Sequence, residues 1–404
     1  MHPKAGPARS DPLSGHDTAR LVEDAAGLEK LLTDLDGVEE YAIDTEFQRE
    51  RTYFSRLALV QVAWAEQVAL VDPLAVDPGG LRPLLESPAL AVLHAAGQDL
   101  EVLEQTCGAV PGTIFDTQVS AGFLGYASVS LLTLAESILG VQLHKVGQLT
   151  DWTRRPLSAS QRVYAAGDVA HLLELRWALD ERLQGVGRAA WAAEECSVLL
   201  GKDRSPTRPE LAWWKLPHSR QLRGASRGVA QEVAAWRESR AQKLDLPVRF
   251  VLSDLALLSI AQRSPTSRAE LSASRGIDGR HLSGGAGEEI LAAVKRGRAL
   301  SSSALNLPPA VAQERSNKPV VTLASAYVAQ CAADMHLDPA VLATRGDLLS
   351  FFQEPSAGRL TSGWRAELLE DVLKRLAGGT AALAFDGAGR LVLEERSGRP
   401  VVGV

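Results

Sequence analysis

Short apolar runs separated by polar turns characterise the first part of the chain. Predominantly apolar stretches lie at 41–43, 57–64 and 67–71, the middle one reading LALVQVAW. Three such runs in close succession predict an antiparallel meander of strands. A fourth apolar run at 90–94 precedes a bend of small residues and a helical pattern at 98–106, which predicts an α/β crossover. The pattern therefore predicts a mixed sheet flanked by helices.

Helical periodicity dominates the next segment, up to about residue 200. Ser158 is suitably placed to begin one of these helices as its N-cap. The predicted helices span 117–125, 129–139, 158–185 and 188–200.

A second helical region follows a polar boundary with two prolines, GKDRSPTRP at 201–209. Its helical patterns lie at 222–243, 253–261, 267–274 and 286–297, which predicts a small helical bundle. Residues 301–319, rich in Ser, Pro, Asn and Lys, are expected to form a linker, and helical patterns resume after it. The runs TAALAF and RLVLEE, joined by DGAG, predict a hairpin at 380–395.

The expected organisation is thus a series of three folded regions. The first 18 residues are polar and rich in Pro and Gly, so we expect a disordered leader there. The expected domains span 19–200, 207–300 and 320–404.

Length and composition restrict the class of protein. With 404 residues, 46% of them hydrophobic, the chain can form two or three domains with cores. No stretch approaches the roughly 18 to 20 uninterrupted apolar residues that a membrane span needs, so we expect no membrane partner. Three widely separated cysteines without Cys-x-x-Cys spacing indicate neither a zinc site nor a disulfide framework, which fits a reducing cytoplasm.

The net charge of −6 is unevenly distributed. Residues 1–200 contain 15 Lys and Arg against 28 Asp and Glu, whereas residues 204–300 contain 17 against 9. An acidic first half and a basic middle can belong to one nucleic-acid-binding chain if cations offset the carboxylates while the middle region binds phosphates. The alternative is that the basic residues only solvate helix surfaces.

Four acidic residues in three separated segments are candidates for metal ligands. Asp44 and Glu46 end an apolar run, and in a strand they would point to one side, roughly 6 to 7 Å apart. Asp99 falls in the first turn of a predicted helix, where it would otherwise only complement the helix dipole. Tyr164 and Asp168, four residues apart, share a helix face, unless they are simply a half-buried Tyr beside a surface Asp.

Together these carboxylates suit a pair of divalent cations. Mg²⁺ and Mn²⁺ prefer oxygen ligands, and two ions about 3.5 to 4 Å apart need several carboxylates to neutralise and bridge them. The constellation therefore predicts a cofactor of two divalent metal ions and metal-dependent cleavage of phosphodiesters.

Three motifs carry a family resemblance. DTEF at 44–47, LHAAGQDLEV at 93–102 and TDWTRRPLSASQRVYAAGDV at 150–169 resemble ribonuclease D, and the match covers most of residues 38–180. The Tyr-x-x-x-Asp form is similar to the DEDDy subgroup of 3′-5′ exonucleases. The resemblance implies a ribonuclease H-like fold and release of nucleoside 5′-monophosphates. It implies that Asp44, Glu46, Asp99 and Asp168 bind the two metals and that Tyr164 orients the attacking water.

The resemblance extends to neighbouring residues and to the helical regions. Lys145, Trp152 and Arg155 match the family pattern, which implies that they contact nucleic acid. Phe47 is expected either to stack on the terminal base or to be an ordinary core residue. His94 and His144 are expected to be structural. LPVRFVLSDLALLSIAQRSPTSRAEL at 246–271 is similar to an HRDC domain, and residues 320–377 resemble a second, divergent one. Phosphate contacts, or merely a solvated helix face, are expected at Lys215, Arg220, Arg223 and Arg227.

These features favour a metal-dependent 3′-5′ exoribonuclease that acts on structured RNA 3′ ends, such as tRNA precursors. One alternative is a DNA exonuclease, because the phosphate is common to both polymers and no reader of the 2′-hydroxyl is evident. The other is a non-catalytic adaptor that binds nucleic acid, in which the acids only form a solvated face. Digestion of matched RNA and DNA, and the loss of products in Asp44→Ala, separate these possibilities.

Overall fold

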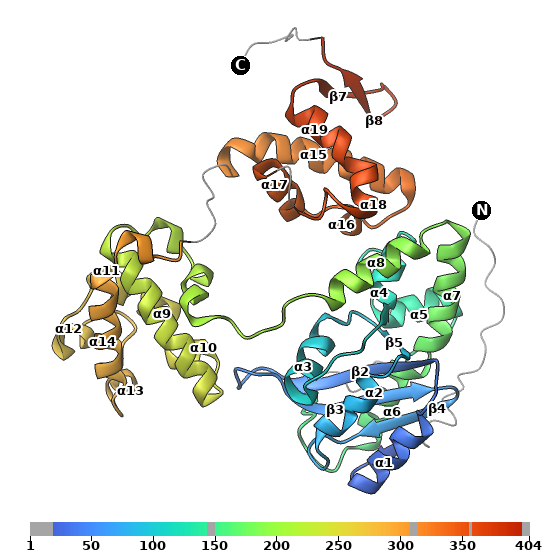
Figure 1. Cartoon of the computed structure of the whole chain (residues 1–404), viewed down its shortest axis with the longest axis horizontal. Helices are drawn as coiled ribbons and strands as arrows, with labels where there is room; N and C mark the ends of the chain where they lie inside the picture. The colour runs from blue at the N-terminus through green and yellow to red at the C-terminus, as the bar shows by residue number, and fades with distance from the viewer. Residues whose placement is uncertain (1–18, 144–149, 308–313, 355–357, 398–404) are drawn as a thin grey trace. The chain divides into compact units, whose positions relative to one another are not determined.

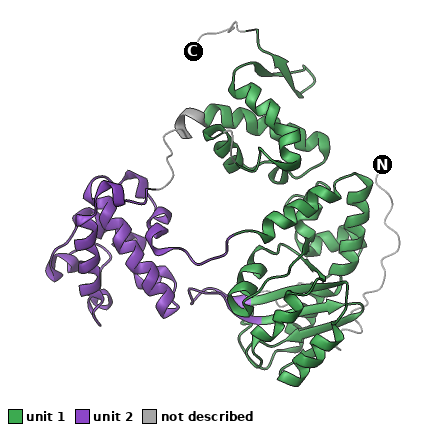
Figure 2. Cartoon of the chain, in the orientation of Figure 1, with its two compact units in different colours: residues 1–46, 59–202, 311–404 green, residues 47–58, 203–310 purple. Residues whose placement is uncertain are grey.

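The computed structural model describes residues 19–143, 150–307, 314–354 and 358–397. The chain divides into two compact units, shown in Figure 2. Unit 1 comprises residues 1–46, 59–202 and 311–404, and unit 2 comprises residues 47–58 and 203–310. In the described ranges, no helix is both long and apolar enough to cross a membrane.

A six-stranded sheet forms the centre of the N-terminal part (Figure 1). Its strands are β1 (Arg20–Val22), β2 (Glu40–Gln48), β3 (Arg56–Trp64), β4 (Gln67–Val71), β5 (Leu90–Leu93) and β6 (Ile114–Asp116). Their order is β1-β4-β3-β2-β5-β6. Strands β3 and β4 are antiparallel, whereas β1 runs parallel to β4, and β5 runs parallel to both β2 and β6. The predicted mixed sheet is confirmed; the two three-residue strands, β1 and β6, were not expected.

Helices flank this sheet. They are α1 (Ala25–Asp34), α2 (Arg82–Leu85), which continues the 3₁₀ turn η2 (Pro78–Leu81), α3 (Gly97–Cys107), α4 (Thr117–Gly122), α5 (Leu131–Leu139), α6 (Ala159–Ala170), α7 (Leu172–Gly185) and α8 (Ala189–Leu200). Helix α6 packs against β4 and α7 against β5, while α1 packs against β1. The sheet is therefore held between helices that come from widely separated parts of the chain.

The single helix expected at 158–185 is two helices, which corrects the prediction. His171 separates α6 from α7, and its backbone angles of φ −111° and ψ 2° depart from helical values. Val169 before the break and Leu172 after it enter one apolar cluster with Val92 of the sheet. The helix breaks here because the segments on both sides of His171 pack on the same face of the sheet. No Gly or Pro at the break indicated it in the sequence.

The C-terminal part of unit 1 is mainly helical. Its elements are α15 (Glu314–Met335), α16 (Pro339–Leu342), α17 (Arg345–Gln353), α18 (Gly363–Arg365), the π-helical turn η6 (Ala366–Glu370), α19 (Asp371–Ala377), β7 (Ala381–Phe385) and β8 (Leu391–Glu395). Strands β7 and β8 pair antiparallel, so the predicted hairpin is confirmed. Helix α15 begins inside the range that was expected to be a linker.

This C-terminal part packs against α8 and against the end of α4. The indoles of Trp191 and Trp364 stack with centroids 4.9 Å apart and planes 13° from parallel, and Phe123 meets Trp364 edge-on at 5.2 Å. Glu195 of α8 accepts a hydrogen bond of 2.6 Å from Arg359 Nη2 and another from Arg365 Nη1. An apolar cluster with a buried ion pair thus joins two segments of unit 1 that are distant in sequence.

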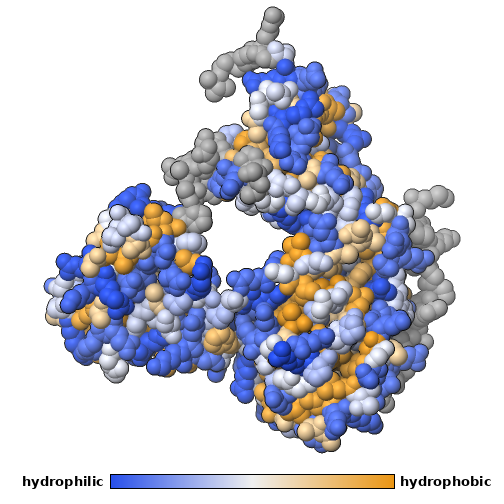
Figure 3. Space-filling view, viewed as in Figure 1, coloured by the Kyte–Doolittle hydropathy of each residue, from blue (hydrophilic) through white to orange (hydrophobic). Residues whose placement is uncertain are grey.

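Unit 2 is a helical bundle. Its elements are the 3₁₀ segments η3 (Pro209–Lys215), η4 (Ser219–Gln221) and η5 (Ser302–Ala304), with α9 (Ala225–Leu244), α10 (Val248–Val251), α11 (Asp254–Arg263), α12 (Arg268–Ser272), α13 (Gly279–Leu282) and α14 (Ala286–Ala299). Its core includes Trp213, Val233, Leu257 and Ile290. Hydrophilic residues cover most of the face of this bundle that Figure 3 shows. The bundle expected from the sequence is present.

Two glycines set the distance between α9 and α14. A Cβ atom on Gly228 would lie 2.2 Å from the carbonyl oxygen of Gly297, and one on Gly297 would lie 2.5 Å from the carbonyl oxygen of Gly228. Both gaps are far shorter than a van der Waals contact. The two helix backbones therefore touch at a point where no larger residue fits.

Candidate active site

Strand β2 carries the first two candidate ligands near its end. Asp44 and Glu46 are half-buried, while Thr45 between them is buried, as expected for alternating side chains. Burial raises the pKa of Asp44 well above its ordinary value, and the charges of Asp99, Asp168 and Glu46 raise it further. Burial also raises the pKa of Glu46 to about 8, assisted by the charges of Asp168 and Asp99. The strand thus presents two carboxylates that resist ionisation.

A carboxylate from β6 fixes the bend that positions Asp99. Asp116 accepts hydrogen bonds from the backbone N–H groups of Ala95, at 3.1 Å, and Ala96, at 2.8 Å. Ala95 has a φ of +58°, which a non-glycine residue rarely adopts. Helix α3 begins immediately afterwards at Gly97, so the buried Asp99 lies in its first turn, as predicted.

Asp99 is held by strand β2. Thr45 Oγ1 donates a hydrogen bond of 2.5 Å to Asp99 Oδ1. Burial raises the pKa of Asp99 to about 6, the hydrogen bond from Thr45 opposes that rise, and the charge of Asp116 adds to it. The carboxylate is therefore fixed in place yet poorly stabilised as an anion.

Helix α6 supplies Asp168 and Tyr164. Ser158 begins this helix with a capping box, in which Gln161 N donates to Ser158 Oγ at 3.2 Å and Ser158 N donates to Gln161 Oε1 at 3.0 Å. One turn apart, the Tyr164 hydroxyl donates a hydrogen bond to Asp168. Burial raises the pKa of Asp168 to about 7 despite this bond. Burial and the charge of Asp168 raise the pKa of Tyr164, so its hydroxyl stays protonated at neutral pH.

The four carboxylates share one electrostatic environment. Burial is the largest cause of the raised pKa at each of them, and Asp44 and Glu46 are further affected by Asp99 and Asp168. Such a concentration of poorly compensated acids is suited to divalent cations, which bind carboxylate oxygens. Within the described ranges, however, no three Asp, Glu, His or Cys side chains are already arranged around one ion position. The set is a chemically suitable group of ligands, without a closed coordination shell.

Trp152 and Arg155, two of the residues expected to contact nucleic acid, make structural contacts beside Tyr164. Trp152 is buried, and its ring lies 5.9 Å from that of Tyr164 at an angle of 42°. Arg155 Nη2 donates to Asp72 Oδ1 at 2.7 Å, and its Nε donates to the other carboxylate oxygen at 2.5 Å. Arg155 also donates to the Trp152 carbonyl at 2.7 Å. These contacts position the segment that leads into α6, and a role in binding RNA stays a prediction for both residues.

Three basic residues of unit 2 make contacts within that unit. Lys215 Nζ donates to Thr207 Oγ1 at 2.7 Å, Arg223 Nη1 to the Arg220 carbonyl at 2.7 Å, and Arg227 Nε to the Leu222 carbonyl at 2.8 Å. Arg220 itself is exposed. Part of the hydrogen-bonding capacity of these cations is therefore already used to shape the segment before α9, and their role as phosphate contacts stays a prediction.

The remaining candidates have different outcomes. His94 is structural, as expected: its Nδ1 lies 2.9 Å from Thr117 Oγ1 and its Nε2 lies 3.2 Å from the Val129 carbonyl. Phe47 is half-buried near the end of β2, and base stacking there stays a prediction. His144 and Lys145 lie outside the described residues.

Sequence reasoning did not single out two residues that shape the site. Thr45 lies between two candidate acids but is polar and uncharged, so nothing marked it as the partner of Asp99. Asp116 follows the apolar pair Ile114–Phe115 and caps α4 by accepting from Gln118 N at 2.8 Å. An Asp between a short apolar run and a helix is an N-cap signal, which could have located it.

Two family models match the chain. Residues 19–184 match a 3′-5′ exonuclease and residues 226–294 match an HRDC domain. Together with the sheet and the four acids, they define a 3′-5′ exonuclease that carries an HRDC domain. Ribonuclease D of Granulibacter bethesdensis is 35% identical, covering 91% of this chain and 94% of that protein. Ribonuclease D of Gluconacetobacter diazotrophicus is 36% identical, covering 88% and 93% respectively. The chain belongs to the ribonuclease D family.

A solved structure agrees with this assignment. The crystal structure of Escherichia coli RNase D, described as an exoribonuclease involved in structured RNA processing, is similar with a TM-score of 0.82 and 30% identity. The match covers 90% of this chain and 99% of that one. The expected fold class is confirmed, and the protein is a 3′-5′ exoribonuclease, an enzyme that hydrolyses RNA.

Proposed function

We propose that this exoribonuclease works with two divalent cations, Mg²⁺ or Mn²⁺, held by Asp44, Glu46, Asp99 and Asp168. The observation that carries the proposal is the convergence of four acids from β2, α3 and α6, whose pKa values are raised by burial and, for Asp44 and Glu46, by the other acids. When bound, the cations would lower the pKa of the attacking water and offset the charge on the leaving 3′ oxygen.

Tyr164 is suited to orient the attacking water. Its hydroxyl donates to Asp168, which leaves the lone pairs of the phenolic oxygen able to accept a hydrogen bond from water. Because the pKa of Tyr164 is raised, the group stays a neutral hydroxyl throughout the neutral range. Trp152 packs against the same ring and restricts its rotation. Tyr164 therefore acts as a fixed acceptor and not as a general base.

The substrates we propose are structured RNA 3′ ends, such as those of tRNA precursors, and the products are nucleoside 5′-monophosphates. The similar Escherichia coli RNase D is involved in structured RNA processing, which supports this substrate class. The excess of Lys and Arg in residues 204–300 supports a phosphate-binding role for unit 2. The proposed domains are 19–200, 207–300 and 320–404. All three cysteines are free, which suits a reducing compartment such as the cytoplasm.

The test is a product analysis with the purified chain. A uniformly labelled RNA hairpin with a 3′ overhang is incubated with increasing Mg²⁺ or Mn²⁺, and the released nucleotides are identified by chromatography. We expect 5′-monophosphates, which disappear with a chelator and in Asp44→Asn. Glu181→Gln, an exposed acid on α7, is the matched control and should keep full activity. Release of 3′-phosphates, or full activity of Asp44→Asn, would overturn the proposal.

A further inference from the structure

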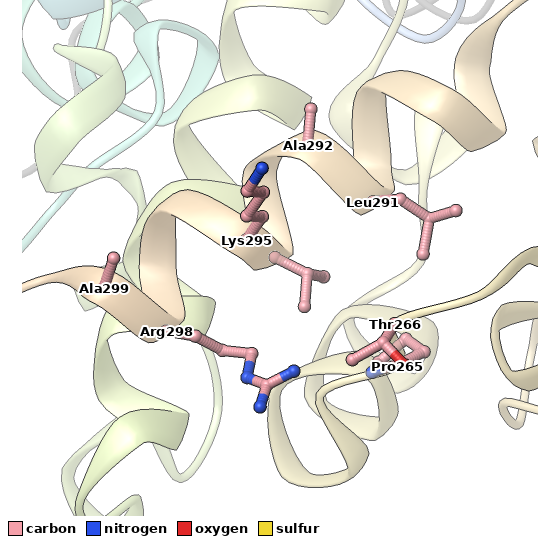
Figure 4. Close-up of a pocket in the computed structure, with 8 residues that line it drawn as sticks. Pro265, Thr266, Leu291, Ala292, Lys295, Arg298 and Ala299 are labelled. Carbon is pink, nitrogen blue, oxygen red and sulfur yellow. The ribbon is translucent and has the colours of Figure 1, made fainter.

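Unit 2 contains a pocket beside α14 (Figure 4). Its volume is about 580 Å³, and it lies between α14 and the turn that connects α11 to α12. Pro265, Leu291 and Val294 supply apolar surface, and Thr266 lines the turn side. Pockets of roughly 300 to 1,000 Å³ with apolar walls and a few polar groups are typical of ligand sites. The volume is sufficient for one nucleotide.

Two exposed cations complete the lining. Lys295 and Arg298 are three positions apart on α14, so they share a helix face. Figure 4 shows Arg298 extending from α14 toward Thr266 and Pro265. In the described part of the chain, neither cation makes a hydrogen bond or an ion pair. Arg298 is attracted electrostatically to the carboxylate of Glu270. The two cations are therefore available to an incoming anion.

Neighbouring basic residues are not available in this way. Arg296, between the two cations in sequence, donates to Glu232 at 2.8 Å, and Arg268 donates to Glu288 at 2.8 Å. Glu270 is itself occupied by the pocket's turn, where it accepts from Thr266 N at 2.7 Å and Thr266 Oγ1 at 3.1 Å. The pocket thus combines a positive rim with an apolar wall, and the nearby carboxylate of Glu270 is already hydrogen-bonded to Thr266.

We propose that this pocket binds one nucleotide of a single-stranded RNA segment. The base would lie against Pro265 and Leu291, and the flanking phosphates would pair with Lys295 and Arg298. Apolar contact with a base does not depend on which base it is, and the two cations would contact only phosphate. Such sequence-independent binding suits an enzyme that shortens many RNA ends. The inference rests on the proposed function for its ligand class. The RNA contacts of unit 2 would then come from α14, the last long helix of the bundle, and not from the basic residues before α9.

The test measures RNA binding by the whole chain without hydrolysis. Fluorescence anisotropy of labelled single-stranded oligoadenylate is followed in a chelator at several salt concentrations. The double variant Lys295→Gln/Arg298→Gln should reduce the slope of log affinity against log salt by about 1.4, since each phosphate contact to a single strand contributes roughly 0.7. Affinity at low salt should fall about 10-fold or more. Leu291→Ala should weaken binding and leave the slope unchanged.

Two further variants make the result specific. Arg296→Gln removes a cation from the same helix that is already paired with Glu232, so it should alter the salt slope by less than half as much. Glu270→Gln removes the nearby negative charge and should strengthen binding. Circular dichroism and the melting temperature establish that each variant is folded. A folded double variant with unchanged slope, or an equal effect of Arg296→Gln, would overturn the pocket assignment.

This outcome is separable from a failure of the proposed function. The binding assay contains no divalent cation, so it reports on the pocket whether or not the chain releases mononucleotides. If the chain releases 5′-monophosphates but the double variant binds normally, only the pocket proposal fails. If the double variant loses affinity but no mononucleotide is released, only the catalytic proposal fails.

Discussion

Thr45 Oγ1 donates a 2.5 Å hydrogen bond to Asp99 Oδ1, and both residues are buried. Thr45 lies between Asp44 and Glu46 on β2, whereas Asp99 lies in the first turn of α3. The bond therefore connects two of the three elements that supply the acidic residues. It also lowers the pKa of Asp99 against the effect of burial, so it keeps more of that carboxylate ionised.

Thr45→Val should weaken cation binding. The substitution keeps the shape of the side chain but removes the donor, so the pKa of Asp99 should rise above about 6 and protons should compete better with cations. A hydrogen bond to a charged group contributes about 1.5 to 3 kcal/mol, which corresponds to an increase of about 10-fold or more in the Mn²⁺ concentration for half-maximal activity. Thr45→Ser keeps the hydroxyl and should stay near the parent value. An unchanged Mn²⁺ requirement in Thr45→Val would contradict the role of this bond.

Tyr164→Phe should slow hydrolysis by roughly 10² or more, the range expected for a positioned catalytic group. Affinity for RNA, measured in a chelator, should stay within about 2-fold. Tyr41→Phe is a matched control, since the Tyr41 hydroxyl is buried and, within the described residues, has no hydrogen-bond partner. Equal rates for Tyr164→Phe and Tyr41→Phe would remove Tyr164 from the mechanism.

Cations should stabilise the fold more at high pH than at low pH. Burial and neighbouring acids raise the pKa of Glu46 to about 8, and burial raises those of Asp168 to about 7 and Asp99 to about 6. The folded chain thus binds more protons than the unfolded chain, so the stability these groups contribute is complete below their ordinary pKa and is lost as pH rises through 6 to 8. Mn²⁺ offsets the charges that appear over that range.

The measurement is the increase in melting temperature that Mn²⁺ produces over a chelator, at pH 6 and at pH 8. We expect the larger increase at pH 8 and a smaller difference between the two pH values in Glu46→Gln/Asp168→Asn. The same increase at both pH values would show that these carboxylates do not bind the cation.

The ion pair at Glu195 should make the C-terminal part of unit 1 sensitive to acid. Burial alone would raise the pKa of Glu195, but hydrogen bonds from Arg365 and Arg359 outweigh it and lower the pKa. A lowered folded-state pKa means that the stabilisation is complete above the ordinary Glu value of about 4.3 and is lost as pH falls below it. The near-ultraviolet circular dichroism of the stacked Trp191 and Trp364 should report this loss.

Glu195→Gln provides the comparison. Removing one partner of a buried ion pair costs about 3 to 5 kcal/mol, so this variant should unfold at lower denaturant concentration at pH 7. Between pH 5 and about 3 it should lose the steep decline of the tryptophan signal, because the titrating group is absent. An identical pH profile in the parent chain and in Glu195→Gln would assign the acid response to other groups.

Local patterns were sufficient to place the candidate ligands on the correct elements. Alternation along β2 places Asp44 and Glu46 together, and the four-residue spacing places Tyr164 next to Asp168. Strands β1 and β6 were missed because each has three residues, too few to show a period of two. Each forms by pairing with a strand far away in sequence, β1 with β4 and β6 with β5. Only the folded chain reveals such pairing.

The partners of the basic residues could not be predicted. Arg155 was expected to contact RNA, which stays a prediction, and nothing in the sequence indicated that its guanidinium bonds to Asp72, 83 residues away in sequence. Charge counting located an excess of Lys and Arg in residues 204–300 but could not separate Arg296, which is paired, from Lys295 and Arg298 at the pocket. Whether a cation is engaged depends on tertiary packing, which a count of charges does not contain.

The contact between Gly228 and Gly297 limits how this bundle can vary. A methyl group on either residue would meet the opposite backbone, so α9 and α14 must keep one separation and one axial register. Substitutions are therefore tolerated at the outward positions of α14, where cationic side chains can be gained, lost or exchanged while the contact with α9 stays the same. If α14 contacts RNA as proposed, exchanges at those positions would change the affinity for RNA without altering the separation of the two helices.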